Sequence, residues 1–509
     1  MDDLSKQLQQ EISRIKQGGK QKYHEQLKKQ NKLFVRERLA RLFDEDSITE
    51  DYLFAEANQP ELPADALITG MGKIDGRVVA FAAGDASVKA GSWGAKTVEK
   101  FLRIQETAMS LKIPLLYLVD SAGARITDQI DVFPGRRHAG RIFYNQIKYS
   151  GVAPQIAILF GPSPAGAAYM PAFCDLVIMV EGNASAYLGS PRMAEMVIGE
   201  KVTLEEMGGA RMHCSVSGLG DFLAKDEAEA IQLAKSCLDY LPQNYQSAIT
   251  ASAAKPPALA QSLKEIIPEN TNRAFDMKKL IDALVDADSF LEVKAEFAKE
   301  LIVGFARLNG KQIGLIANQP KVKAGTLFAD SSDKAARFIQ LCNAYGLPLL
   351  FLSDVPGFMI GSQVERSGII RHGAKFVAAV AQATVPKISV IVRKCYGAGL
   401  YAMCGPAFGT DITLALPSAQ IAVMGPEAAV NAVYANHIET LSAEEKTTFI
   451  EQKREEYRQD IDLYRLASEM IIDGIVDFDA LRDELIQRYE LYQTKKELFA
   501  ERINPIYPV

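Results

Sequence analysis

Four short segments rich in small residues could hold a negatively charged oxygen with their backbone amides. In the first half of the chain they are Asp120–Arg125, after the apolar run IPLLYLV, and Gly161–Ala167, after QIAIL. In the second half they are Asp354–Gly357, after LPLLFLS, and Tyr396–Gly399, after KISVIVRKC. Small residues that follow a buried strand let N–H groups approach a ligand closely. We therefore expect oxyanion holes, which stabilise charge that develops during a reaction.

Glycine and alanine after a strand also have a purely structural explanation. They occur wherever a helix packs tightly on a sheet, and for any single segment this explanation is at least as good as the functional one. In each half, one such segment follows each of two buried strands, and these places correspond between the halves. This recurrence favours the functional interpretation.

The two halves of the chain are related by a repeat with a nearly constant offset. Gly70 aligns with Gly304, for example, 234 positions further along the chain. Solenoid repeats run only about 20 to 50 residues, so this repeat is a whole domain. We predict an N-terminal domain over residues 1–250 and a C-terminal domain over residues 251–509, joined through a segment rich in Ala, Pro, Ser and Gln.

Apolar runs alternate with helical patterns in the same order in both halves. In the first half, a hairpin, a helix, a strand, a helix and a strand are expected over residues 66–85, 98–111, 113–120, 139–149 and 155–161. The second half repeats this order over residues 301–318, 335–345, 347–354, 373–382 and 387–392. Apolar strands between helices predict an α/β fold whose sheets are covered on both faces. Residues 5–43 have apolar residues at helical spacing, which predicts a helical extension of the first domain.

Composition argues against several classes of function. The 509 residues carry a formal net charge of −6, which provides no basic surface for nucleic acid or an anionic membrane. The six cysteines form no CxxC pair and the five histidines form no HExxH motif, so no metal site is expected. The first residues lack the apolar stretch of a secretory signal, and we expect a cytoplasmic protein with reduced cysteines and no membrane span.

Longer motifs are similar to those of one enzyme family. They are DSAGARI, DVFPGRRHAGRIFYNQ, GPSPAGAAYMPAFCD, NQPKVKAGTL, DVPGFMIG, GIIRHGAKFVAAVAQATVPKISVIVRKCYGAGLYAMCGPA and SAQIAVMGPEAA. Over roughly Arg36 to Val509, the chain resembles the carboxyltransferase (beta) subunits of biotin-dependent acyl-CoA carboxylases of the propionyl-CoA and methylcrotonyl-CoA type. The resemblance implies two tandem crotonase-like (ClpP/crotonase superfamily) domains related by internal duplication. It also implies a hexamer in which two trimers stack face to face.

The resemblance further implies how the reaction proceeds. Acyl-CoA binds the N-terminal domain of one subunit, and carboxybiotin binds the C-terminal domain of an opposing subunit. Carboxybiotin releases CO₂, the biotin oxyanion takes the α-proton of the acyl-CoA, and the resulting enolate attacks CO₂. By motif match, the amides of Ala122 and Gly123 hold the enolate, and those of Ala398 and Gly399 hold the ureido oxyanion of biotin. Because the cofactor carries the difficult chemistry, no protein acid or base is required.

The same resemblance assigns binding residues and partners. Lys89, Ala90 and Gly91 match the place where crotonase-type chains hold the adenine and phosphates of CoA. The other cofactor-binding positions lie in or next to the small-residue segments and are Gly166, Gly397 and Tyr401. No Ala-Met-Lys-Met biotinylation site occurs, so biotin is expected on a separate carrier protein. The implied partners are a biotin carboxylase and a biotin carboxyl carrier subunit.

The motifs leave the acyl-CoA substrate open. Ala122-Gly123 stands where the family has Gly-Gly, which narrows the pocket by a methyl group. Residues 397–401 read GAGLY, as in methylcrotonyl-CoA carboxylases, whereas GIIRHGAK and NQPKV are closer to propionyl-CoA carboxylases.

Two other functions remain open. The first is the carboxyltransferase subunit of a biotin-dependent acyl-CoA decarboxylase or transcarboxylase, because the sequence does not fix the direction of transfer. The second is a crotonase-type CoA-thioester hydratase. A hydratase needs carboxylates that activate water, and residues 120–150 contain no glutamate, so carboxyl transfer is the preferred hypothesis.

Overall fold

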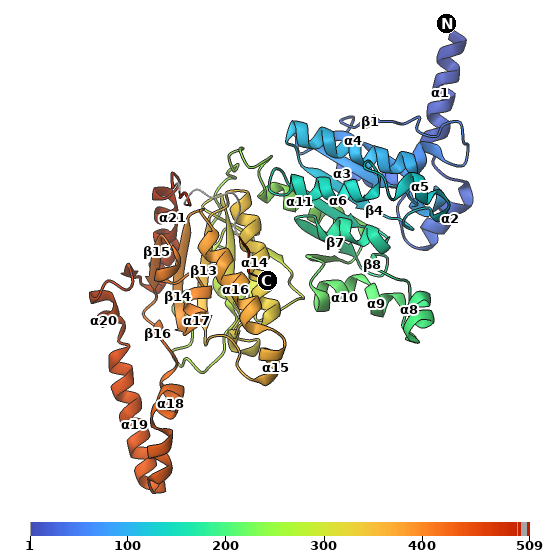
Figure 1. Ribbon diagram of the computed structural model, residues 1–509. Helices are drawn as coiled ribbons and strands as arrows, with labels where there is room; N and C mark the ends of the chain where they lie inside the picture. Colours follow the sequence, from blue (N-terminus) through green and yellow to red (C-terminus); the bar gives the residue numbers. More distant parts are fainter. Residues whose placement is uncertain (1, 496, 500–505, 509) are drawn as a thin grey trace. The chain divides into compact units, whose positions relative to one another are not determined.

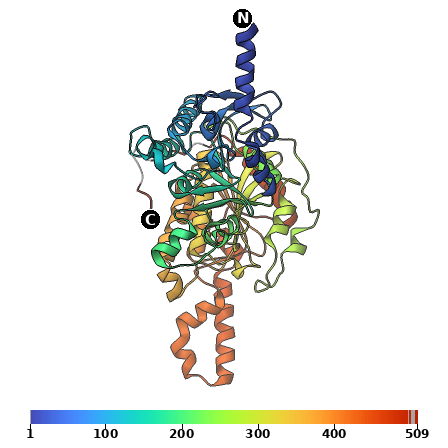
Figure 2. The ribbon, with the colours of Figure 1, turned by 90° about the vertical axis from the view of Figure 1, so that its right-hand side faces the viewer.

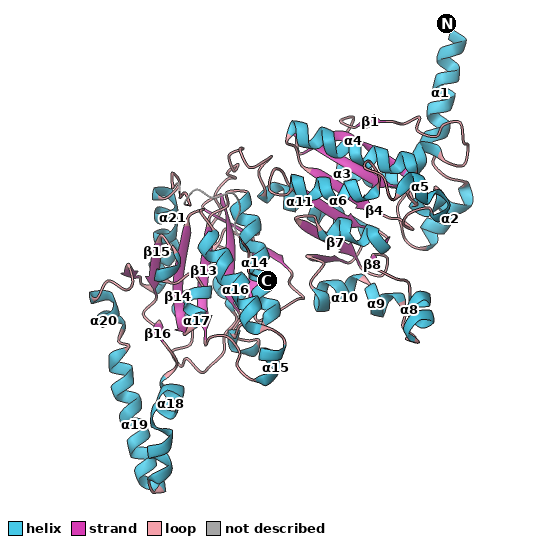
Figure 3. Ribbon diagram, in the orientation of Figure 1, coloured by secondary structure: helices cyan, strands magenta, loops and turns pink. Residues whose placement is uncertain are grey.

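The computed structural model describes residues 2–495, 497–499 and 506–508 and divides the chain into two units (Figure 1). The first unit is Met1–Ala248 and the second is Ile249–Val509. Each unit has its own sheet with helices packed against it, as the colours of Figure 3 show. The division falls in a segment with little regular structure, where only the short helix α12 (Leu263–Ile266) forms between residues 241 and 276.

The sheet of the first unit has seven strands in the order β1-β2-β3-β4-β5-β7-β9. These strands are β1 (Thr49–Asp51), β2 (Leu67–Ile74), β3 (Arg77–Gly84), β4 (Leu115–Val119), β5 (Gln155–Leu159), β7 (Leu176–Val180) and β9 (Phe222–Ala224). The pairs from β1 to β3 are antiparallel and those from β3 to β9 are parallel. A separate two-stranded sheet pairs β6 (Pro162–Pro164) with β8 (Ser185–Tyr187). Every residue of β4, β5 and β7 is buried, as expected for parallel strands covered on both faces.

Helices connect the parallel strands, because a parallel connection needs a crossover. The helices of the first unit are α1 (Asp2–Lys16), α2 (Gln21–Lys29), α3 (Val35–Leu42), α4 (Ala95–Leu111), α5 (Gln129–Val132), α6 (Ala139–Tyr149), α7 (Tyr169–Ala172), α8 (Pro191–Ile198), α9 (Leu204–Gly208), α10 (Ala210–Met212) and α11 (Glu227–Tyr240). The predicted N-terminal extension is thus three helices, and α3 packs on α11. Helix α4 packs on β2, β3 and α6, and α11 packs on β5 and β7.

The sheet of the second unit repeats this arrangement in the order β10-β11-β12-β13-β14-β15-β17, and β16 also pairs with β14. Its strands are β10 (Leu291–Val293), β11 (Leu301–Leu308), β12 (Lys311–Asn318), β13 (Leu349–Val355), β14 (Lys387–Tyr396), β15 (Ile412–Ala415), β16 (Gln420–Ala422) and β17 (Gly474–Ile475). The pairs from β10 to β12 are antiparallel and those from β12 onwards are parallel.

The helices that complete the second unit follow the same order as those of the first. They are α13 (Met277–Leu284), α14 (Ala329–Ala344), α15 (Ser362–Arg366), α16 (Ile369–Gln382), α17 (Ala398–Ala402), α18 (Pro426–Thr440), α19 (Ala443–Asp460), α20 (Leu463–Ser468) and α21 (Leu481–Leu491). Helices α18 and α19 pack on each other as a hairpin that extends away from the sheet of their unit (Figure 2). In the described part of the chain, no helix combines the length and apolar character that crossing a membrane requires.

The strand register confirms the internal duplication and the α/β fold that the sequence predicts. In the first hairpin Gly70 of β2 pairs with Phe81 of β3, and in the second Gly304 of β11 pairs with Leu315 of β12. Both members of the second pair lie 234 positions after their counterparts. The two units therefore share their hydrogen-bonding pattern as well as their order of elements.

Three helices begin earlier than their apolar patterns suggest. The helix expected from residue 373 begins at Ile369, and the other two have caps that explain their earlier start. The helix expected from residue 98 begins at Ala95, and the helix expected from residue 335 begins at Ala329. In α4 the hydroxyl of Thr97 accepts a hydrogen bond from the Gly94 N–H, and in α14 the hydroxyl of Ser331 accepts one from the Phe328 N–H. Such caps satisfy N–H groups at a helix start, so polar residues extend both helices beyond their apolar faces.

Candidate functional site

In the first unit, the loop after β4 lies against the turn that contains Lys89, Ala90 and Gly91. The Trp93 N–H donates to the Gly123 carbonyl at 2.8 Å, and the Arg125 N–H donates to the Trp93 carbonyl at 2.9 Å. The structure thus brings together two of the segments that the sequence singles out.

The segment after β5 reaches the same place. A Cβ atom added at Gly123, where φ is +88°, would lie 3.1 Å from Cγ of Pro164, two residues before the predicted residue Gly166. Ala122, Gly166 and Ala90 are exposed, so a ligand can approach them. All the residues predicted for the acyl-CoA side therefore belong to three adjoining loops of one unit.

The Lys89–Gly91 turn has an unusual backbone that requires its glycine. All three residues have positive φ, at 45°, 54° and 69°. A Cβ atom at Gly91 would lie 2.1 Å from the Asp120 carbonyl oxygen, which no side chain could tolerate. The hydroxyl of Ser121 donates to the Gly91 carbonyl at 2.7 Å and fixes the turn to the loop.

Both amides predicted to hold the enolate form hydrogen bonds within the protein. The Ala122 N–H donates to the Ala90 carbonyl at 2.9 Å, and the Gly123 N–H donates to the Ser121 hydroxyl at 3.0 Å. An oxyanion bound here has to replace these two acceptors. Sequence reasoning missed this feature, although a hydroxyl two residues before a predicted amide donor is a signal for it.

The second unit forms the same two backbone hydrogen bonds between the equivalent residues. The Leu327 N–H donates to the Gly357 carbonyl at 3.0 Å, and the Met359 N–H donates to the Leu327 carbonyl at 2.9 Å. The preceding turn, Lys323–Gly325, has φ values of 45°, 54° and 73°, which match those of the first unit.

The second unit differs at one of these amides, because the Gly357 N–H has no acceptor in the described part of the chain, where the Gly123 N–H of the first unit donates to Ser121. Val355 and Pro356 stand where the first unit has Ser121 and Ala122, so no hydroxyl reaches the Gly357 N–H. A Cβ atom at Gly399 would lie 3.2 Å from Cα of Gly357, so the loop after β14 adjoins the loop after β13.

Among the described residues, the N–H groups of Gly357, Ala398 and Gly399 have no hydrogen-bond acceptor. Gly397, which has φ of +55°, instead donates its N–H to the Ala422 carbonyl at 3.0 Å. Tyr401 is 44% exposed and its ring lies 5.0 Å from that of Phe408. These free donors make the second unit ready to bind a partial negative charge.

The lysines of the two turns have different surroundings. The Lys323 ammonium lies 3.5 Å from a carboxylate oxygen of Glu300 and 4.2 Å from the centre of the Phe328 ring. Lys89 is exposed and has no carboxylate partner among the described residues, because Ala66 stands where the second unit has Glu300. Lys89 is therefore the lysine of the two that has no carboxylate competing with a phosphate group.

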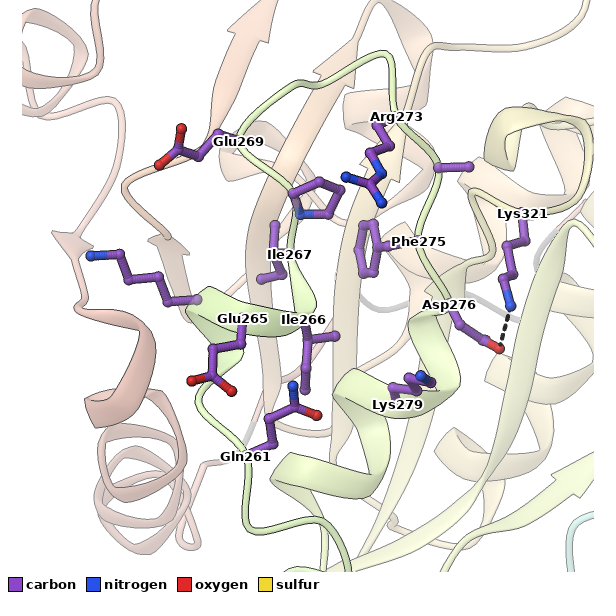
Figure 4. A pocket seen from close by; sticks show the side chains of 13 residues that line it. Gln261, Glu265, Ile266, Ile267, Glu269, Arg273, Phe275, Asp276, Lys279 and Lys321 are labelled. Atoms are coloured by element: carbon purple, nitrogen blue, oxygen red, sulfur yellow. Dashed lines mark hydrogen bonds and ion pairs between the residues drawn. The ribbon is translucent and has the colours of Figure 1, made fainter.

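A cavity of about 390 Å³ lies elsewhere in the second unit (Figure 4). It is lined by residues 261, 264–269, 273–276, 279 and 321 and contains none of the predicted site residues. Its basic side chains are all exposed, and one of them, Lys321, pairs with Asp276 at 3.2 Å. We place no reactant in it. Within the described part of the chain, no group of three or more His, Cys, Asp or Glu side chains is arranged to hold a metal ion.

Comparisons with known proteins agree with this geometry. The family described as "Carboxyl transferase domain" matches residues 26–505. The chain is 62% identical to "Uncharacterized carboxylase YngE" of Bacillus subtilis, over 100% of this chain and 99% of that one. It is 40% identical to the "Putative propionyl-CoA carboxylase beta chain" of Bacillus subtilis, over 94% of both chains.

A solved structure with the same fold is the transcarboxylase 12S hexamer with methylmalonyl-coenzyme A and methylmalonic acid bound. The TM-score is 0.95 at 37% identity, with 100% of this chain and 98% of that chain covered. This match confirms the two-domain, crotonase-like architecture that the motifs imply. Both the repeated loops and these comparisons lead to one conclusion: the chain belongs to the carboxyl transferase family of biotin-dependent acyl-CoA enzymes.

Proposed function

We propose that this chain is the carboxyltransferase subunit of a biotin-dependent acyl-CoA carboxylase. It moves a carboxyl group from carboxybiotin, carried on a separate protein, to the α or γ carbon of a short-chain acyl-CoA such as propionyl-CoA or 3-methylcrotonyl-CoA. The observation that carries this proposal is the pair of amide-lined loops, one in each unit, on a chain of the carboxyl transferase family.

The first unit is proposed to bind the acyl-CoA. Its support is the unpaired Lys89, which can meet a phosphate of CoA, whereas its counterpart Lys323 is held by Glu300. Ala90, Gly91 and Gly166 line the approach to the thioester. Charge-assisted bonds from lysine to phosphate are about twice as strong as neutral hydrogen bonds. A single ammonium without a carboxylate partner therefore favours the first unit over the second as the one that binds CoA.

In the first unit the substrate oxygen is proposed to displace the internal acceptors of Ala122 and Gly123. A neutral thioester oxygen gains little by this exchange, because it replaces one neutral hydrogen bond by another. An enolate oxygen gains more, because its bonds to the same N–H groups are charge-assisted. The exchange therefore favours the charged state over the bound substrate, which is the requirement for catalysis.

The second unit is proposed to bind biotin. Its support is the set of free N–H groups of Gly357, Ala398 and Gly399, which can stabilise the ureido oxyanion that forms when carboxybiotin loses CO₂. Gly397 and Tyr401 flank these groups. Held there, biotin would supply both the carboxyl group and the base for the acyl-CoA proton, so no side chain of this chain would have to act as a base.

The active assembly is proposed to be a hexamer that works in the cytoplasm with a biotin carboxylase and a biotin carboxyl carrier subunit. The related transcarboxylase 12S protein is a hexamer. All six cysteines of this chain are buried and none of them forms a disulfide, which fits a reducing compartment.

The test combines the purified chain with a biotin carboxylase, its biotinylated carrier, ATP and labelled bicarbonate. We expect label in the product of at least one of propionyl-CoA, 3-methylcrotonyl-CoA and acetyl-CoA. Label in none of the three would contradict the proposal. Gly399→Val, whose Cβ meets Val355 at 3.1 Å, should stop transfer while acyl-CoA binding measured by calorimetry persists. Gly140→Ala, with open space around the added Cβ, is the matched control.

The likeness to the transcarboxylase 12S protein supports a second candidate, transfer between two acyl compounds. In that case methylmalonyl-CoA should load the carrier's biotin with a carboxyl group in the absence of ATP and biotin carboxylase. A chain that carboxylates acyl-CoA only when both are present is a carboxylase component. Hydration of crotonyl-CoA without any biotin would instead point to the hydratase.

A further inference from the structure

Each unit has a buried aspartate at the end of its central strand, and the two aspartates are neutralised from different parts of the chain. Asp120 follows β4 and is 2% exposed, and Asp354 is its equivalent in β13 and is fully buried. A carboxylate without water around it is costly unless cations or N–H groups surround it. The origin of those groups therefore decides which segments each site depends on.

Asp120 is neutralised by the N-terminal helical segment. The Lys32 ammonium donates to Oδ1 of Asp120 at 2.7 Å, and the Arg38 guanidinium donates to Oδ2 at 3.1 Å. Arg38 also forms two bonds with Glu227 at 2.8 and 2.6 Å, and its guanidinium lies over the Phe160 ring. Two cations and two anions are thus buried together with no net charge.

Asp354 takes its cation from within its own sheet. Arg393 of β14 donates to Oδ2 of Asp354 from Nε at 3.1 Å and from Nη2 at 2.7 Å. The Lys394 N–H completes the set by donating to Oδ1 at 3.1 Å. No residue of the first 43 takes part in this arrangement, so the two sites have separate supports.

Asp120 is also the point at which the loops of the first site meet. Cβ atoms added at Gly91 and Gly161 would lie 2.1 Å from the Asp120 carbonyl oxygen and 1.9 Å from its Oδ1. The chain around Asp120 is therefore packed without spare room. Any movement of its carboxylate is passed to the Lys89–Gly91 turn and to the Ala122–Gly123 loop that begins two residues later.

We propose that Lys32 and Arg38 are positioning residues of the acyl-CoA site. They hold Asp120 in place and, through it, the loop that carries the amides of Ala122 and Gly123. The N-terminal helical segment is then part of the first active-site half, and Arg393 has the same role in the second half. This inference rests on the proposed function for its kinetic consequences, but its structural consequences can be measured without turnover.

Charge balance supplies the decisive test. Lys32→Met leaves Arg38 with two anions, and Asp120→Asn leaves Glu227 with two cations, so each single change strands one buried charge. The double variant Lys32→Met/Asp120→Asn leaves only the Arg38–Glu227 pair and is balanced. We expect each single variant to raise KM for acyl-CoA at least tenfold, and the double variant to lie closer to the wild type than either single one. Additive losses in the double variant would overturn the proposal.

The matched control is Arg393→Met in the second unit. It should raise KM for the biotinylated carrier and leave KM for acyl-CoA within about twofold, which is the reverse of Lys32→Met. A similar rise of both constants in every variant would show a loss of folding alone and would overturn the assignment. Lys32→Gln, which keeps a polar side chain, is used in parallel if Lys32→Met is poorly folded.

Hydrogen exchange of the full chain separates this proposal from the proposed function. Lys32→Met should increase exchange of the amides in residues 120–125 and leave residues 354–359 unchanged, and Arg393→Met should do the opposite. This result is expected even if the wild-type chain carboxylates none of the acyl-CoA substrates. Equal protection of residues 120–125 in the wild type and in Lys32→Met would refute the positioning role, whatever the activity.

Discussion

Lys100 and Lys334 occupy equivalent positions in the two units, and each directs its buried ammonium at the first carbonyl of the hairpin that precedes it in the chain. Lys100 donates to the Leu67 carbonyl, at the start of β2, and Lys334 donates to the Leu301 carbonyl, at the start of β11, at 2.6 Å. Both also donate to carbonyls of the preceding turn. Burial lowers the pKa of Lys100 to about 8 and that of Lys334 to about 7.

The lowered pKa of Lys334 predicts a stability that rises with pH. In the unfolded chain a lysine has a pKa of about 10.4, so between about pH 7 and 10 the unfolded state holds the extra proton. The free energy of unfolding contributed by this site therefore increases with pH, by up to about 1.4 kcal/mol per pH unit. Guanidinium unfolding followed by circular dichroism at pH 6.5, 7.5 and 8.5 measures this slope.

Lys334→Met should lose this contribution. The difference in stability between the wild type and the variant should then grow from pH 7 to pH 8.5. Lys100→Met should show the same behaviour beginning about one pH unit higher, since the pKa of Lys100 is about 8. Profiles for the wild type and Lys334→Met that run parallel over this range would contradict the lowered pKa.

Replacing the glycine of either turn should damage one site and spare the other. Gly91→Ala places a methyl group 2.1 Å from the Asp120 carbonyl oxygen at a φ of +69°, and should cost at least about 2 kcal/mol. Gly325→Ala places one 2.7 Å from the Asp354 carbonyl oxygen at a φ of +73°. We expect the first to raise KM for acyl-CoA and the second to raise KM for the biotinylated carrier. The two effects are measured in the same carboxylation assay, and indistinguishable effects would argue against separate sites.

Because the Lys89 ammonium has no carboxylate partner, replacing Lys89 and replacing Lys323 should have different effects on KM for acyl-CoA. Lys89→Ala should raise KM for acyl-CoA at least about tenfold, because a charge-assisted bond to phosphate contributes on the order of 1.5 to 3 kcal/mol. Lys323→Ala should leave this KM unchanged, because Lys323 is held by Glu300. Assays with acyl-dephospho-CoA show which phosphate is contacted. An equal KM for Lys89→Ala and the wild type would remove Lys89 from the CoA site.

The buried pair of Asp65 and Arg125 should be a large contributor to the stability of the first unit. Asp65 is 1% exposed and lies 2.6 Å from the Arg125 guanidinium. Asp65 has φ of +49°, which asparagine also tolerates, but Asp65→Asn leaves the arginine without a charged partner, so it should cost about 2 to 3 kcal/mol. Trp93, the single tryptophan, adjoins Arg125 and reports the unfolding of this unit by fluorescence.

An exposed ion pair of the same unit provides the control. Glu99 pairs with Arg103 at 2.8 Å, with the two side chains 32% and 48% exposed. Glu99→Gln should therefore change the stability of the first unit by less than about 1 kcal/mol. A larger effect for Glu99→Gln than for Asp65→Asn would show that burial is not what makes the Asp65 pair important.

The order of elements and the positions of the loops could be predicted from the sequence because their signals are local. The apolar runs of β4 and β13 and the helices predicted at residues 139–149 and 373–382 are visible in short windows, and the constant offset carries each observation from one half to the other. The glycines after the strands also stand out, because a small residue there indicates either a tightly packed helix or a close approach of the backbone to a ligand.

The supports of the loops could not be predicted in this way. Lys32 and Asp120 are 88 positions apart, and the pair of Lys323 and Glu300 crosses a hairpin, so neither leaves a local pattern. The sequence shows which residues are charged but not which residues they pair with. For the same reason the amides of Ala122 and Gly123 could be identified as donors, whereas their present acceptors became known only from the folded chain.

The different origins of the cations at Asp120 and Asp354 set a rule for rebuilding this protein in the laboratory. The second half contains its arginine in the strand beside the aspartate, so a gene fragment that encodes this half brings its own counter-ion. The first half depends on Lys32 and Arg38, which come before its first strand. Chimaeras that graft the first half onto another chain must therefore begin upstream of Lys32, while the second half carries the cation for its buried aspartate wherever it is grafted.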